Sequence, residues 1–202
     1  MRDLFFDGEK HEYYYKGEKK PCASDILKLI DCVALDGIPP RNLNMASERG
    51  TRIHEATDDY DYGLIDIEDE EWAEENSDIY PYVKAYADFN KDYSGFPVAS
   101  ELPLYCEKTG VAGTIDLVRN VYGELAIIDK KSSSSLKFLR NAIQLNIYRI
   151  NWNETHAQKV ESLYVLHLQN NGKYRLIPIG VDEDLAFKWI GIYNEIKSDK
   201  KI

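Results

Sequence analysis

The sequence predicts an α/β fold in which a central mixed β-sheet is flanked by helices. Most of the first half of the chain carries apolar residues at helical spacing, whereas residues 98–131 contain three consecutive apolar runs of strand length joined by short turns. Helical and strand patterns then alternate to residue 197. With 202 residues and no linker-like segment, the chain is expected to form one domain, 1–202. Residues 1–43 would form an N-terminal hairpin and helix, and 44–202 the core.

The composition is that of a globular protein, with 44% hydrophobic and 30% charged residues. No apolar run approaches the roughly 20 residues of a membrane span. The first ten residues, MRDLFFDGEK, lack the apolar core of a signal peptide. We therefore expect a cytoplasmic protein with no membrane partner.

The charge is unevenly distributed. The formal net charge of −10 argues against nucleic-acid binding by bulk electrostatics. Residues 53–83 contain twelve acidic side chains and no Lys or Arg, whereas residues 119–149 contain six basic side chains and two acidic ones. A polyanionic substrate at the locally basic segment is therefore compatible with the acidic total.

The three cysteines, Cys22, Cys32 and Cys106, are an odd number at wide spacing, and no two form a Cys-x-x-Cys pair. A disulfide framework, a structural zinc site and an iron–sulfur cluster are therefore not expected. The pattern favours buried free thiols.

The N-terminal elements follow from turn residues and apolar spacing. Aromatic runs on both sides of Asp7-Gly8 predict a hairpin or meander that decorates the core. Ser24 is the expected N-cap of a first helix, which ends in a loop at 37–40. A second helix is expected from about 43 to 60 because four apolar residues share one stripe. They are Met45, Ile53, Ala56 and Tyr60.

The remaining elements are expected in a fixed order. Residues 61–76 form an exposed acidic loop with a short helix around Trp72. The later helices are expected at 79–93, at 136–151, and from a cap at Asp182 to 197, and the strands at 98–106, 111–119, 124–131, 161–168 and 173–180.

Two carboxylates stand out in residues 111–135. Asp116 interrupts an apolar strand pattern, and Asp129 ends the next one. Residues 119–123 contain turn-compatible Asn and Gly, so the two strands are expected to form an antiparallel hairpin that brings the carboxylates together. Such a pair repels unless a cation or a proton lies between its members, and leaving both ionised and partly buried costs roughly several kcal/mol.

The helix at 136–151 carries a polar strip between two apolar stripes. A strip of this kind faces a groove or a buried polar partner more readily than open water. Its members are Lys137, Asn141, Gln144 and Tyr148.

Four segments of the chain form an ordered set, at 48–54 (ERGTRIH), 113–116 (GTID), 129–132 (DKKS) and 144–148 (QLNIY). Together they resemble the RecB-like branch of the PD-(D/E)XK nuclease superfamily, and phage-type single-domain exonucleases most. Residues 13–27 also resemble the opening segment of phage and mitochondrial members. The resemblance covers about residues 11–150 and implies a restriction-endonuclease-like core.

The resemblance also implies a role for each matching residue. Asp116 and Asp129 would ligate Mg²⁺ or Mn²⁺, hard ions that prefer oxygen ligands. His54 and the backbone carbonyl of Lys130 would complete the metal site, with Glu101 as a supporting ligand. A further residue, Lys131, would position and activate the attacking water. Gln144 and Tyr148 would hold the DNA backbone or orient Lys131. Lys137 and Arg140 are also expected to contact DNA.

Each of these residues also fits a purely structural role. Taken alone, His54 is compatible with a hydrogen-bonded helix histidine, and Asp129 with Lys131 is compatible with a strand-end ion pair. Gln144 and Tyr148 are compatible with polar packing between helix and sheet. The occurrence of all these residues together, in this order, is what favours a metal-dependent nuclease site.

The sequence thus predicts a metal-dependent DNA exonuclease that acts on single- or double-stranded DNA ends. It would serve phage-type recombination or repair in bacterial or phage-infected host cytoplasm, and the resemblance implies a single-strand annealing or binding protein as a partner. A structure-specific endonuclease and a catalytically silent DNA-binding or assembly module are the alternatives. Polarity, strand preference, the number of metals and oligomeric state are left open.

Overall fold

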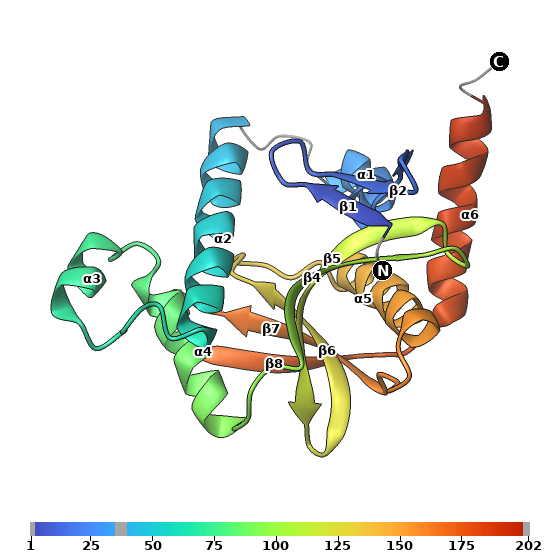
Figure 1. The fold of residues 1–202 in the computed structure, drawn as a ribbon. Coiled ribbons are helices and arrows are strands. Elements are labelled where there is room, and N and C mark those ends of the chain that lie inside the picture. Colours follow the sequence, from blue (N-terminus) through green and yellow to red (C-terminus); the bar gives the residue numbers. More distant parts are fainter. Residues whose placement is uncertain (1–2, 35–39, 200–202) are drawn as a thin grey trace.

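The computed structural model describes residues 3–34 and 40–199, and its centre is a five-stranded mixed sheet. The strand order is β4-β5-β6-β7-β8, in which β6 and β7 are parallel and the other neighbours antiparallel. The strands span Ala99–Cys106, Val111–Val121, Glu124–Lys131, Ser162–Leu168 and Tyr174–Ile179. Helices cover both faces (Figure 1), so the predicted α/β class is confirmed.

The two faces of the sheet bury separate apolar clusters, because alternate residues of a strand point to opposite sides. On one face lie α1 (Ala23–Ala34), α5 (Phe138–Thr155) and α6 (Glu183–Asp199). On the other face lie α2 (Pro40–Asp61) and α4 (Tyr80–Asp92).

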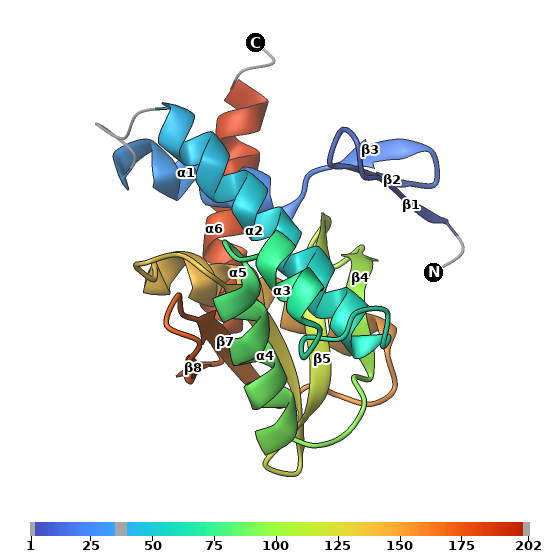
Figure 2. The same cartoon turned by 90° about the vertical axis from the view of Figure 1, so that its left-hand side faces the viewer.

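The acidic segment between α2 and α4 contains the short helix α3 (Glu70–Glu75), as predicted. Figures 1 and 2 show α3 projecting beyond α2 and α4, away from the sheet. No helix in residues 3–34 and 40–199 combines the length and the apolarity needed to cross a bilayer.

The N-terminal segment forms the expected meander, a three-stranded antiparallel sheet of β1 (Leu4–Asp7), β2 (Glu12–Tyr15) and β3 (Glu18–Lys20). This small sheet stands at one end of β4 and β5 (Figure 2). Tyr13 and Ala112 are buried in a third small cluster that joins the two sheets.

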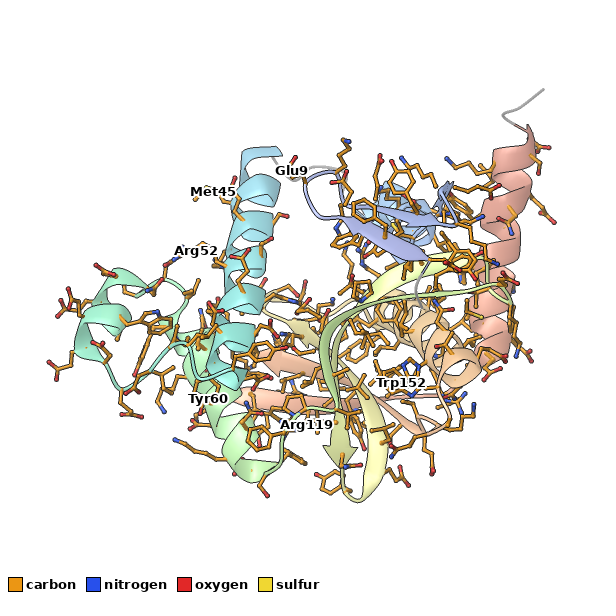
Figure 3. The ribbon with its side chains drawn as sticks, viewed as in Figure 1. Glu9, Met45, Arg52, Tyr60, Arg119 and Trp152 are labelled. Carbon is orange, nitrogen blue, oxygen red and sulfur yellow. The ribbon has the colours of Figure 1, made fainter. Side chains whose placement is uncertain are left out.

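Three local predictions are wrong. Helix α1 begins at Ala23, so Ser24 is not its N-cap; instead, Asp25 accepts a hydrogen bond from the backbone N–H of Cys22 at 3.2 Å. Met45 is 59% exposed on the outer side of α2 (Figure 3), because the buried stripe of that helix begins lower, at Ile53. Pro40 is the first residue of α2 rather than part of a loop, and 37–39 lie outside the described residues.

The predicted hairpin of β5 and β6 is present. Tyr122 and Gly123 form its turn with φ of 53° and 87°, the pair of positive values that a type I′ turn requires. Pairing between the strands ends at Leu117 and Ile128. Beyond this pair, β6 pairs only with β7, which leaves an opening beside Asp116.

Candidate metal centre

The centre of the site is an interruption in the pairing of β4 and β5. Ladder pairs join Ser100 to Leu117 and Leu102 to Ile115, but the two residues between them, Glu101 and Asp116, form no pair. Glu101 has a φ of 43°, a left-handed value that is unusual for a residue other than glycine.

The side-chain alternation shifts by one residue at this break. Ile115 and Val118 belong to the same apolar cluster, whereas Leu117 belongs to the cluster on the other face. Residues three apart share a face only where the strict two-residue period is interrupted. Glu101 and Asp116 are the opposed residues at this interruption, so their side chains lie side by side where the regular ladder is broken.

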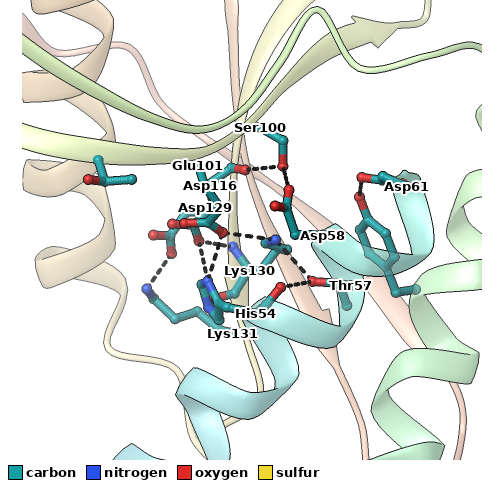
Figure 4. A network of polar contacts seen from close by, with 12 residues as sticks. His54, Thr57, Asp58, Asp61, Ser100, Glu101, Asp116, Asp129, Lys130 and Lys131 are labelled. Atoms are coloured by element: carbon teal, nitrogen blue, oxygen red, sulfur yellow. Dashed lines mark hydrogen bonds and ion pairs between the residues drawn. The ribbon is translucent and has the colours of Figure 1, made fainter. Parts of the chain in front are cut away.

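His54 of α2 faces these two carboxylates (Figure 4). Its Nδ1 lies 3.3 Å from Glu101 Oε1 and 3.8 Å from Asp116 Oδ2. One ligand atom from each of the three residues lies within 4.8 Å of the other two. Glu101, predicted as a supporting ligand only, is thus a full member of this group of three.

Lys130 contributes its backbone to the same site. Its carbonyl oxygen lies 3.2 Å from His54 Nε2, and its expected role as a backbone ligand stays a prediction. Its N–H donates to Asp116 Oδ2 at 2.7 Å, which satisfies an amide that the diverging strands leave without a ladder partner. That hydrogen bond orients the carboxylate of Asp116.

The side chain of Lys130 takes the opposite direction from its neighbour Lys131, as strand alternation predicts. It is fully buried, and its ammonium donates to Thr57 Oγ1 at 3.0 Å and pairs with Glu101 Oε1 at 3.1 Å. The same ammonium lies 5.7 Å from the ring centroid of Tyr86. Lys130 is therefore an internal counter-ion for Glu101, a role that the sequence did not predict.

Asp129 and Lys131 share one face of β6. Lys131 Nζ forms an ion pair with Asp129 Oδ2 at 2.7 Å. Asp129 is 1% exposed and does not belong to the group of His54, Glu101 and Asp116. Its expected role as a metal ligand stays a prediction.

These groups border a cavity of about 550 Å³. His54, Glu101, Asp116 and Lys131 line it, whereas Asp129 lies beneath its surface. The α5 residues Arg140, Gln144 and Tyr148 line the same cavity, and Gln144 Nε2 donates to the hydroxyl of Tyr148 at 3.1 Å. Of the residues expected to contact DNA, only the exposed Lys137 does not line this cavity.

Gly113 permits a close approach of α5 to β5. A Cβ atom at this position would lie 2.4 Å from Cε1 of Tyr148, a separation that packed atoms do not reach. The glycine of the GTID segment is thus needed for space, and it fixes where the ring of Tyr148 lies.

The N-terminal sheet forms part of the cavity wall, through Phe6, His11 and Tyr13. The hydroxyls of Tyr13 and Thr114 lie 2.8 Å apart, which connects β2 to the GTID segment. Burial raises the pKa of Tyr13 to about 12. The sequence predicted this sheet only as an addition to the core. The one signal that it contributes to the site was the resemblance of residues 13–27 to the opening segment of phage nucleases.

Protons balance the charges of the site. Burial lowers the pKa of His54, but the carboxylates of Asp116 and Glu101 outweigh it and raise that pKa above the usual value. Burial raises the pKa of Glu101, but His54 and Lys130 outweigh it, and the net shift is downward. His54 and Glu101 thus each favour the charged form of the other.

The second acid–base pair behaves differently. Burial and, to a lesser degree, Asp116 raise the pKa of Asp129 despite its contact with Lys131. Burial lowers the pKa of Lys131, but Asp129 and Asp116 outweigh it and raise that pKa above the usual range. Lys131 therefore carries a full positive charge beside the cavity at neutral pH.

The residues fit a divalent cation. Two carboxylates, an imidazole and a backbone carbonyl oxygen converge at the break in β4 and β5. Oxygen-rich sets with one imidazole suit Mg²⁺ and Mn²⁺. A cation bound there would balance the negative charge of Glu101 in place of the proton on His54.

No family model and no curated protein sequence matches this chain. Among solved structures, one described as "Crystal structure of SSO0001" is similar over 86% of this chain and 74% of that chain, with 14% sequence identity and a TM-score of 0.37. Function must therefore be inferred from the chemistry of the cavity.

Proposed function

We propose that this protein is a metal-dependent deoxyribonuclease that hydrolyses phosphodiester bonds, acting as an exonuclease in phage-type DNA recombination or repair. The observation that carries the proposal is the convergence of His54, Glu101 and Asp116 beside a charged lysine, Lys131, in one cavity. The order of the motifs, which resembles that of RecB-like nucleases, supports the same activity.

The chain's own residues have distinct tasks in this reaction. His54, Glu101, Asp116 and the carbonyl of Lys130 would hold Mg²⁺ or Mn²⁺. When bound, such an ion supplies positive charge to a phosphate and makes water more acidic. Asp129 keeps the Lys131 ammonium at the cavity wall, where it can hold an attacking water and attract the phosphate.

The opposite wall provides groups for the DNA backbone. Arg140 and Gln144 offer N–H donors, the groups with which proteins most often contact phosphate oxygens. Tyr148 is held by Gln144 and by its packing against Gly113, so it presents a fixed surface to the strand.

The size of the cavity favours action at ends. A volume of about 550 Å³ is that of a small-molecule site, which suits one strand end better than an intact duplex. The N-terminal sheet lines one side and narrows the access. A structure-specific endonuclease of the same fold is the second candidate.

The test is digestion of end-labelled single- and double-stranded DNA with Mg²⁺ or Mn²⁺, comparing the wild type with Lys131→Ala. We expect the variant to lose at least about a hundredfold in rate, the usual cost of removing one group that stabilises charge in the transition state. Equal rates would disprove the role of Lys131. No cleavage by either protein would favour a silent DNA-binding module.

Closed circular DNA separates the two nuclease candidates. An exonuclease leaves closed circles intact and degrades the same DNA once it is linearised. Cutting of closed circles at a comparable rate would establish the endonuclease instead.

A further inference from the structure

A second polar cavity, of about 390 Å³, lies next to the metal centre, at the carboxyl ends of the parallel strands β6 and β7. Arg49 of α2, the serines at 132–134 and His167 at the end of β7 line it, together with Gln169 and Asn170. None of the described residues that line it is acidic, whereas the metal cavity is lined by Glu55, Asp58, Glu101 and Asp116.

Arg49, which lines this cavity, has one side-chain donor without a partner among the described residues. Its Nε is buried and has no hydrogen-bond partner in the described structure, while its guanidinium lies 5.7 Å from the ring centroid of Tyr82. A buried donor without a partner costs about 1–3 kcal/mol, so such a group is normally satisfied by a ligand or by water. The planar guanidinium is the side chain best suited to a phosphate.

His167 is a second, independent group with unused hydrogen-bonding capacity. The residue is 8% exposed, and its Nε2 lies 2.8 Å from the carbonyl oxygen of Ser133, so that nitrogen carries the proton. In the neutral ring Nδ1 is then an acceptor, and it is buried without a partner within residues 3–34 and 40–199. A ligand that satisfies both residues has an acceptor for Arg49 and a donor for His167.

A nucleotide unit has both groups, a phosphate and a hydroxyl or amino group. The position of the cavity fits one strand that crosses both sites. Ser132 directly follows Lys131, and Arg49 precedes His54 by five residues on α2, about 7.5 Å along the helix axis at ~1.5 Å per residue. That offset places the two cavities within reach of one strand.

We propose that this cavity binds a nucleotide of the DNA strand whose neighbouring phosphate lies at the metal centre, with Arg49 on the phosphate and His167 on the sugar or base. The inference rests on the proposed nuclease function and adds a second point of attachment. The subsite would fix the register of the strand, which an acidic protein cannot do through bulk charge.

The test uses the dinucleotide pTpT with EDTA, so that no cleavage occurs. The chain has four histidines, so the ring signals of His167 can be followed by NMR. We expect those signals to shift and saturate in the wild type. Arg49→Ala and Arg49→Gln should weaken binding about tenfold, the loss of one charge-assisted contact.

Arg52→Ala is the matched control, because it removes the same charge from the same helix. Arg52 points away from the sheet (Figure 3) and pairs with Asp78 at 2.7 Å. Its loss should change the affinity less than twofold. The subsite is disproved if His167 does not respond, or if Arg49→Gln binds pTpT as tightly as Arg52→Ala does.

A separate Mn²⁺ digestion of labelled DNA distinguishes this inference from the proposed function. Cleavage without a response of His167 would remove the subsite and leave the nuclease. A response that depends on Arg49, without any cleavage, would retain the nucleotide subsite and remove the catalytic proposal.

Discussion

Glu101 and Asp116 occupy opposed positions on β4 and β5 at the one place where the ladder between these strands is interrupted. Like charges in such positions destabilise a sheet. The left-handed φ of Glu101 adds strain of about 1–3 kcal/mol. Repulsion and strain at the same point are typical of a functional site, and here both would be offset by a bound cation.

Metal binding should therefore stabilise the fold. At a hundredfold excess of Mn²⁺ over its Kd, the gain is about 2.7 kcal/mol, or roughly 5–10 °C in Tm. Asp116→Asn should lose most of that rise. Glu55→Gln removes an exposed acid of α2 that lines the cavity outside the metal group, so it should retain the rise. Thermal unfolding in Mn²⁺ and in EDTA measures the effect, and equal shifts in both variants would contradict it.

Lys130→Met should be strongly destabilising. The substitution removes the buried partner of Glu101 and of Thr57, and breaking a buried ion pair typically costs about 3–5 kcal/mol. Lys84→Met is the control, because Lys84 pairs with Asp88 on the surface of α4 and its loss should cost less than about 0.5 kcal/mol. Urea unfolding gives both values, and a similar small loss in each would refute the internal counter-ion.

Gly113→Ala should displace the ring of Tyr148. Overpacking of this kind costs about 1–3 kcal/mol, and we expect cleavage to fall with it because Tyr148 lines the cavity. Gly191→Ala, in α6 with open space around the new Cβ, should be neutral or stabilising by up to about 1 kcal/mol. Unfolding and cleavage are measured for both variants. A Gly113→Ala protein that is active and fully stable would show that the close approach of Tyr148 to Gly113 is unimportant.

The charge of His54 should make stability depend on pH when metal is absent. Because the folded protein raises the pKa of His54, proton binding favours the folded state. That contribution is complete below the unfolded pKa of about 6.5 and disappears as pH rises through the higher folded pKa. The stability difference between wild type and His54→Gln in EDTA should therefore be largest at acid pH and shrink as pH rises. A stability difference that grows as pH rises would contradict this prediction.

Periodicity in the sequence was sufficient for the order of the elements and for most of the faces they bury, with Met45 of α2 as an exception. The strand pattern of 124–131 correctly places Lys131 beside Asp129 and directs Lys130 to the other face. Asp182 caps the final helix as predicted, accepting from the N–H of Leu185 at 2.9 Å. Local spacing determines all of these features.

Features that depend on distant segments were not predictable. The shift in alternation at Asp116 needs a matching break at Glu101 in another strand, and residue types alone do not specify a positive φ there. The ion pair between Lys130 and Glu101 depends on that break. Arg49 and His167 share a cavity because α2 packs across the ends of β6 and β7, a packing that local patterns do not encode.

The contact between Tyr13 and Thr114 spans 101 positions of the chain. During synthesis on a ribosome, β2 emerges long before its partner in β5 exists, so the N-terminal sheet must wait for more than half of the protein to be made. The part of the cavity wall that this sheet provides therefore forms late in synthesis. A nascent chain of this protein would lack this part of the cavity wall until its own translation was well past the middle.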